Sequence, residues 1–158
     1  MMDRINRLMK DDEFLQRIGY INEKEINREF CRHGLSHLLD TARIAYILNL
    51  EENMGLDKEM IYAMALLHDI GRSEDKSDEH HSKAGLPVAN ALLERNGFDS
   101  KEIEVICHAI EKHSSGNDGD AYAELLYRAD KLSRDCYECG AIDKCYWNED
   151  IKNRKLKY

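Results

Sequence analysis

The chain has 158 residues, with 23 Lys and Arg against 31 Asp and Glu, which gives a formal net charge of -8. This length fits one domain with its own hydrophobic core, and the negative charge disfavours nucleic acid as a partner because no basic cluster dominates the chain. The amino terminus lacks the apolar run of a signal peptide, and no later stretch approaches the length of a membrane span. We therefore expect a cytoplasmic protein without membrane contacts, in which residues 1–158 form a single domain.

Apolar residues recur at steps of three and four along nearly the whole chain, without convincing alternation of apolar and polar residues. This pattern predicts an all-α fold, a single-domain helical bundle of about six to eight helices. Residues 1–30 form a helical lead-in, in which one or two amphipathic helices run from about Asp11 to Phe30. Gly19 is a candidate break within that stretch.

Caps and glycines mark the next two predicted helices. The second helix runs from about Gly34 to Asn53, with Gly55 close behind as a stop, and its inward face carries Leu38, Ala42, Ala45 and Leu48. The third runs from about Asp57, which caps it, to Ile70, and Gly71 ends it.

Polar residues from Arg72 to Asp78 predict a loop before a fourth helix that ends near Gly97. The start of that helix is left open by Pro87, because proline is comfortable only in a first turn. The fifth helix spans about Ser100 to His113, capped by Asp99 or Ser100. A loop from Ser114 to Gly119 then leads into a sixth helix from about Asp120 to Arg134.

Helical phase places four polar side chains on the inward faces of four helices: His37, His68, His113 and Asp130. A single one of these is better explained as a hydrogen-bonded core residue, but four together are what a divalent transition metal needs. Nitrogen and oxygen donors suit Fe, Mn, Ni, Co or Zn. Asp69 directly follows His68, and both reach one site because Gly71 puts them near the helix end.

These residues resemble a known signature. His37, the segment LHDIG at 67–71 and the segment ADKL at 129–132 are similar to the H…HD…D pattern of the HD superfamily of metal-dependent phosphohydrolases, over roughly Arg28 to Arg134. The resemblance implies an all-helical core whose metal ligands are His37, His68, Asp69 and Asp130.

Two further segments resemble those of binuclear members of this superfamily. His81 begins HSKAG, which is similar to an H-x-x-x-G segment, and AIEKHSSG at 109–116 is similar to A-I-x-x-H-[ST]-[ST]-G. The resemblance implies that His81 and His113 complete a second metal site, as in HD hydrolases that cleave diadenosine tetraphosphate and are usually described with a di-iron centre. The H-H-E and G-Y-P motifs of the cyclic-dinucleotide branch are absent, which disfavours that branch.

The remaining histidines are His33, His80 and His108, which we interpret as spectators. His33 lines up with His37 one turn later and is a candidate for substrate contact. His108 falls on a helix face shared with Glu104, Glu111 and Lys112, which predicts that it is solvated.

The expected chemistry is hydrolysis of a phosphoester or phosphoanhydride bond in a small, nucleotide-like substrate. One or two divalent ions would bind phosphate oxygens and lower the pKa of a bound water, with Asp69 as the bridging ligand. The cations that adjoin the ligand positions are candidates to neutralise developing charge, or else plain surface charges: Arg72, Lys112, Lys131 and Arg134. Two alternatives stay open, a non-catalytic or redox-sensing metal protein and a di-iron oxygenase.

A cysteine-containing extension covers residues 135–158. Cys136, Cys139 and Cys145 follow the spacing C-x2-C-x5-C, which suggests a site for zinc or an iron–sulfur cluster. Cys31 is the preferred fourth ligand and Cys107 the alternative. Five cysteines, an odd number, fit a reducing compartment, where thiols without any metal are the competing interpretation.

Overall fold

The structure is a computed structural model that describes residues 1–74, 81–115 and 119–158. Within these ranges the α-helices are α1 (Asp3–Leu8), α2 (Asp12–Lys24), α3 (Leu35–Glu51), α4 (Lys58–Leu67), α5 (His81–Ala84), α6 (Leu86–Arg95), α7 (Ser100–Lys112) and α8 (Ala121–Leu132). Short 3₁₀ turns are η1 (Ile70–Ser73), η3 (Cys136–Glu138) and η4 (Ile142–Lys144). The described ranges contain no strand, which confirms the all-α prediction.

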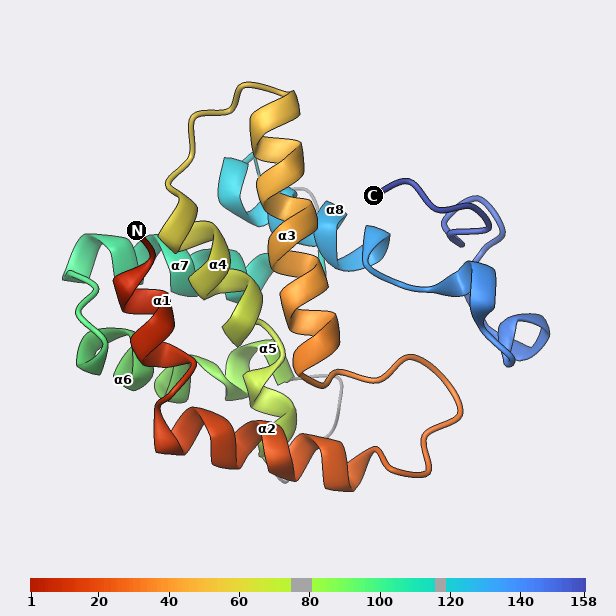
Figure 1. Cartoon of the computed structure of the whole chain (residues 1–158), viewed down its shortest axis with the longest axis horizontal. Helices are drawn as coiled ribbons and strands as arrows, with labels where there is room; N and C mark the ends of the chain where they lie inside the picture. Colours follow the sequence, from red (N-terminus) through yellow and green to blue (C-terminus); the bar gives the residue numbers. More distant parts are fainter. Residues whose placement is uncertain (75–80, 116–118) are drawn as a thin grey trace.

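Helices α3, α4, α7 and α8 surround the core. Helix α3 packs against α4 and α8, and α7 packs against α4, α6 and α8. The predicted inward face of α3 is buried, because Leu38, Ala42, Ala45 and Leu48 are each at most 2% exposed. Helix α2 runs across the end of the bundle at which α3 begins and α4 ends (Figure 1). This end of the bundle carries the polar side chains described below.

Several predicted boundaries are wrong in ways that matter for the site. Gly19 lies inside an unbroken α2 instead of marking a break. Helix α4 ends at Leu67, before Gly71, so His68 is its C-cap and Asp69 lies outside the helix. The predicted loop at Arg72 begins as the 3₁₀ turn η1, whereas its residues 75–78, and residues 116–118 of the later predicted loop, lie outside the described ranges. Pro87 lies in the first turn of α6, where its missing N–H is harmless.

Gly71 and Gly85 let two backbones touch. A Cβ atom added at Gly71 would lie 1.8 Å from the carbonyl oxygen of His81, and one added at Gly85 would lie 2.7 Å from the amide nitrogen of Gly71. Only glycine fits such a contact, because any side chain would meet backbone. The two glycines therefore bring α5, and with it His81, directly against the turn that follows Asp69.

The segment after α8 leaves the bundle (Figure 1). Asn153 fastens it, since its side-chain amide donates to the carbonyl oxygens of Lys131 at 2.7 Å and Arg134 at 2.9 Å. None of the helices in the described ranges has both the length and the apolar composition needed to span a membrane.

Candidate metal centre

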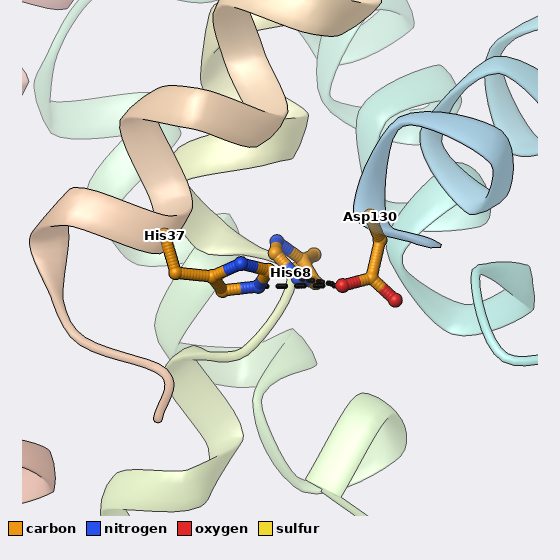
Figure 2. A group of neighbouring side chains, drawn as sticks. All are labelled: His37, His68 and Asp130. Carbon is orange, nitrogen blue, oxygen red and sulfur yellow. Dashed lines mark ion pairs between the residues drawn. The ribbon is translucent and has the colours of Figure 1, made fainter. Parts of the chain in front are cut away.

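His37, His68 and Asp130 converge from three elements (Figure 2). His37 lies in the first turn of α3, His68 follows α4, and Asp130 lies in α8. The Oδ1 atom of Asp130 lies 3.3 Å from Nε2 of His37 and 3.7 Å from Nε2 of His68. These ligand atoms all lie within 4.8 Å of one another, and the side chains are buried. One ion can contact all three.

Asp69 lies between two sets of histidines. Its Oδ2 atom lies 3.0 Å from Nε2 of His68 and 3.5 Å from Nε2 of His37. Its Oδ1 atom faces the other way, 3.2 Å from Nε2 of His81. The Nε2 atoms of His81 and His113 are 3.4 Å apart, and His68, Asp69 and His113 form a second group with ligand atoms within 4.8 Å of one another. Asp69 thus presents one oxygen to each set.

Hydrogen bonds behind the rings set their tautomers. Nδ1 of His68 donates to the carbonyl oxygen of Ala65 at 2.7 Å, and Nδ1 of His113 donates to that of Ile110 at 2.6 Å. Because a carbonyl oxygen only accepts, Nδ1 carries the proton in the neutral ring, and Nε2 is the nitrogen that can bind a metal.

His37 is fixed in a similar way through a hydroxyl. Its Nδ1 lies 3.0 Å from Oγ of Ser133, and that hydroxyl donates its own proton to the carbonyl oxygen of Asp130 at 2.8 Å. The hydroxyl therefore accepts from Nδ1, and Nε2 of His37 is again the lone-pair nitrogen. Three imidazoles present lone pairs to a shared space.

Buried acceptors in that space lack donors. Nε2 of His37, Nε2 of His68 and Oδ2 of Asp69 are buried without a hydrogen-bond partner. Acceptors that face one another out of water are costly, and a cation among them removes the cost. The donor set of imidazole nitrogens and carboxylate oxygens fits a divalent transition metal.

The charges also demand a cation. Burial lowers the pKa of His68, but the carboxylates of Asp69 and Asp130 outweigh it and raise this pKa to about 10. Burial raises the pKa of both carboxyls, yet His68 and His37 hold each well below its usual range. Burial, with His68 nearby, lowers the pKa of His113 to about 4, so this imidazole is neutral at pH 7. The two buried carboxylates are thus ionised, and without a metal the proton that they hold on His68 is the balancing cation, whose place a divalent ion would take.

Three predicted cations pair with the two carboxylates. Nε of Arg72 donates to Oδ1 of Asp69 at 2.8 Å. Asp130 receives Nζ of Lys131 on Oδ2 at 2.9 Å and Nη2 of Arg134 on Oδ1 at 3.1 Å. Arg134 is 8% exposed, so it is not a solvated surface charge.

A cleft of about 130 Å³ opens onto both carboxylates. Its walls include all three cations together with His81 and His113, and it also contains Arg28, His33, Tyr146 and Trp147. His33 is held by Glu25, whose Oε1 lies 2.6 Å from its Nδ1. Burial lowers the pKa of His33, and the hydrogen bond to Glu25 raises it in part. His33 therefore lies at the cleft without joining the ligand groups.

Of the other two histidines, His108 lies within the described residues. His108 is half-buried on α7 and lines neither cleft described here. His80 lies outside the described residues.

Sequence analysis missed several residues of the site, and only for one of them does the sequence contain a weak indication. Ser133 lies three residues after Asp130, so helical phase could have placed it beside the ligand. Glu25 and Arg28 fall within the predicted helical stretch up to Phe30, but α2 ends at Lys24 and both lie beyond it. Only the folded chain brings Arg28 and Trp147 to the cleft and Glu25 to His33.

A second cleft, of about 670 Å³, adjoins the centre and reaches His37 and Arg134. Cys31, Cys136, Cys139 and Cys145 all line it, whereas Cys107 lies on α7 outside it. Cys31, the preferred fourth ligand, thus lies in the same cleft as the other three cysteines, whereas Cys107, the alternative, does not.

The comparisons with known proteins point to one family. The HD domain model matches residues 34–135. An uncharacterised protein of Clostridium beijerinckii is 40% identical over 158 residues, which cover 99% of this chain and 100% of that protein. A ribonuclease Y of Thermus thermophilus is 35% identical over 117 residues, which cover 73% of this chain but 19% of that enzyme.

A third relative is the bifunctional uridylyltransferase/uridylyl-removing enzyme of Rhodopseudomonas palustris, 41% identical over 56 residues, which cover 35% of this chain and 6% of that enzyme. The chain therefore spans only a small part of the two named enzymes. No solved structure matches the chain significantly. The family model covers more than half of the chain, including the positions of all six converging ligand candidates, and the chain belongs to the HD domain family.

Proposed function

We propose that this protein is a metal-dependent phosphohydrolase that cleaves a phosphoester or phosphoanhydride bond of a nucleotide-like substrate. HD domain proteins are typically hydrolases of this general kind. The observation that carries the proposal is the set of buried, donor-free acceptors on His37, His68 and Asp69. A divalent cation among them would satisfy all three acceptors at once, and divalent metals suit hydrolysis at phosphorus.

The distances among the side chains support a role for each ligand. His37, His68, Asp69 and Asp130 would hold one ion, and His81 and His113 would hold a second, with Asp69 shared between them. A bound divalent metal would supply a water of lowered pKa and polarise a phosphoryl oxygen. Iron, manganese, nickel, cobalt and zinc all suit these ligands.

The chain's own cations orient the substrate. Arg72 pairs with Asp69 and Arg134 pairs with Asp130, and each arginine also lines the cleft wall. Lys131, with its side chain 32% exposed, reaches solvent from the same wall. Together with Arg28, they neutralise phosphate oxygens that enter the cleft and stabilise the charge that grows on the leaving oxygen.

Cleft shape supports a nucleotide-like substrate. The 130 Å³ polar cleft suits a phosphate, and the adjoining 670 Å³ cleft shares Phe30 and Trp147 with it, which gives aromatic faces for a base. The names of two relatives, a ribonuclease and a uridylyl-removing enzyme, both refer to nucleotidyl groups. A dinucleoside polyphosphate is one substrate with this chemistry.

The test is a metal-dependent hydrolase assay. The protein is stripped with a chelator, reloaded with Mn, Fe, Co or Ni, and given a panel of nucleotides, dinucleoside polyphosphates, short RNA and a generic phosphodiester. Loss of an outer hydrogen bond to a metal ligand typically reduces activity by roughly 10- to 100-fold. Asp69→Ala removes a ligand itself, so it should reduce turnover by more than this. Asp150→Ala, which removes an exposed carboxylate, should leave turnover unchanged. Inactivity of the wild type with every metal would overturn the proposal.

A further inference from the structure

Four cysteines from two distant parts of the chain line one cleft. Cys31 lies in the loop between α2 and α3, whereas Cys136, Cys139 and Cys145 lie after α8. Figure 1 shows that loop and the C-terminal segment projecting from the same side of the bundle. Three of these thiols are half-buried and only Cys136 is buried, so they do not behave as core residues.

The segment that carries three of the cysteines has almost no core of its own. Between residues 135 and 158, Cys136 and Ala141 are the buried hydrophobic residues, and the regular structure consists of two three-residue 3₁₀ turns. A segment of this size cannot bury enough apolar surface to order itself, and small units of this kind use a metal or a disulfide as a cross-link. All five cysteines of the chain are free, so no disulfide takes that part.

Arg134 lines the same cleft as the four thiols. Nε of Arg134 is buried and has no hydrogen-bond partner. A thiolate beside this guanidinium would supply an acceptor and would be stabilised by its charge.

We propose that Cys31, Cys136, Cys139 and Cys145 bind one Zn²⁺ ion that fixes the C-terminal segment against the bundle. The C-x2-C spacing is that of structural zinc sites, in which four thiolates surround the ion as a tetrahedron. Within the described chain no three of these sulfurs lie within 4.8 Å of one another, so binding draws the turns inward. Those turns are closed by long backbone hydrogen bonds, 3.4 Å at Cys139 and 3.3 Å at Cys145, which can adjust.

The zinc site would shape the candidate catalytic cleft. Cys145 and Trp147 line both clefts. Nζ of Lys131 lies 5.3 Å from the centre of the Trp147 ring and donates to Asp130. Fixing Cys145 therefore holds an aromatic wall beside the ligand carboxylates. The inference does not depend on hydrolysis, because the thiols are separate from the histidine and aspartate ligands.

Cobalt substitution tests this site separately from the centre. The full-length protein is stripped of metal and titrated with Co²⁺, because thiolate ligands give an intense charge-transfer absorption that nitrogen and oxygen ligands do not. The wild type and Cys107→Ser, a matched loss of one thiol outside the cleft, should both show this band with the intensity of one thiolate-bound ion per chain. Cys139→Ser and Cys145→Ser should lose it, whereas Asp130→Asn should keep it.

Metal content and fluorescence can be measured on the wild-type protein, so they test the site even where a cysteine variant folds poorly. A mercurial that blocks thiols should release one Zn²⁺ per chain from the wild-type protein and shift the emission of Trp147, the single tryptophan. Either of two results would overturn the proposal: a wild type without the cobalt–thiolate band, or zinc content equal in Cys107→Ser and in folded Cys139→Ser. Visible absorption with acid-labile sulfide in the purified protein would also overturn it, in favour of an iron–sulfur cluster.

Discussion

Single hydrogen bonds decide which nitrogen each central histidine offers. His68 and His113 each donate Nδ1–H to the carbonyl oxygen three residues earlier, so the helix that carries the ring also fixes its tautomer. His37 depends on another helix, because its Nδ1 partner is the hydroxyl of Ser133 next to α8. Ser133 therefore positions a ligand without touching the space where the ligand atoms meet.

Replacing Ser133 with Ala should weaken metal binding at the centre about 10- to 100-fold, the usual effect of losing an outer hydrogen bond to a ligand. The change leaves a buried N–H on His37 without an acceptor and frees its ring to turn. Competition between the protein and a chromophoric chelator measures the affinity. Ser36→Ala removes an exposed hydroxyl next to His37 and is the matched control. Equal affinities in the two variants would show that Ser133 does not orient the ring.

At the scale of elements, helix ends build the site. Helix α4 stops at Leu67, so His68 and Asp69 are presented by a turn and can both face the centre. The 3₁₀ turn η1 follows at once, and its Gly71 packs against the backbone of α5. His81 reaches Asp69 because these two backbones touch.

Gly71→Ala should destabilise the fold by at least about 2 kcal/mol, since a methyl group there meets backbone that cannot move aside as a side chain would. Gly19→Ala is the opposite case: it lies within α2 with nothing within 4 Å of the added carbon, and it should stabilise by roughly 0.5–1 kcal/mol. Urea denaturation followed by circular dichroism measures both. A Gly71→Ala protein as stable as the wild type would contradict the close approach.

The start of α2 gives a pH-dependent prediction. The hydrogen bond from Arg95 lowers the pKa of Asp11 to about 2 from its usual 3.8. Because the folded-state pKa is depressed, the contribution of this charge is full above the unfolded pKa and is lost as pH falls through the folded pKa. Asp11→Asn keeps an N-capping side chain but removes the charge, so it should destabilise by about 0.5–1 kcal/mol at neutral pH, the range of exposed ion pairs.

The difference between wild type and Asp11→Asn should shrink as pH falls from about 4 towards 2, the window set by the two pKa values. Urea denaturation at several pH values follows it. Asp12→Asn removes a neighbouring charge, whereas the bonds of Arg95 go to Asp11 and Glu13, so this control should show no such narrowing. A gap for Asp11→Asn that stays constant down to pH 2 would rule out the ion pair as its cause.

At the scale of the molecule, ligands on separate helices make the metal a cross-link. The candidate ligands come from α3, from the turn after α4, from α5, from the end of α7 and from α8. The net charge of -8 is no obstacle to a phosphorylated substrate, because metal ions and the paired cations set the local charge of the cleft. A bound metal should therefore stabilise the whole bundle as well as the site.

Removing the metal with a chelator should lower Tm, and Mn²⁺ should restore it. Mn²⁺ is chosen because it prefers nitrogen and oxygen ligands and leaves the thiol-lined cleft alone. At about 100 times Kd, binding adds about 2.7 kcal/mol, which corresponds to roughly 5–10 °C for a domain of this size. Scanning calorimetry should show the Mn²⁺ shift in His108→Ala but not in Asp130→Asn. A Tm shift of equal size in His108→Ala and Asp130→Asn would show that the stabilising ion does not bind at Asp130.

The helical class, the inward faces of the main helices and the convergence of four polar side chains could all be predicted from the sequence. These side chains are His37, His68, His113 and Asp130. The predictions succeed because helical periodicity is a local property, which appears in the sequence as three- and four-residue spacing. The sequence also predicted Asp57 as an N-cap, and either Asp99 or Ser100 as another. In the structure Asp57 and Asp99 are the caps, and their side chains accept from amides within three residues. The predictions at Gly19 and Gly71 were wrong: Gly19 does not break α2, and α4 ends before Gly71, at Leu67. A glycine alone is interpreted as a helix break, and only its neighbours in the fold show what it does.

Contacts between segments that are distant in the chain could be found only in the tertiary structure. The partnership of Ser133 with His37 spans 96 residues, and the contact of Gly71 with α5 depends on how two backbones pack. The cleft walls formed by Arg28 and Trp147 come from segments outside the helices. Such contacts leave no repeating pattern, since they depend on how packed helices orient the loops between them.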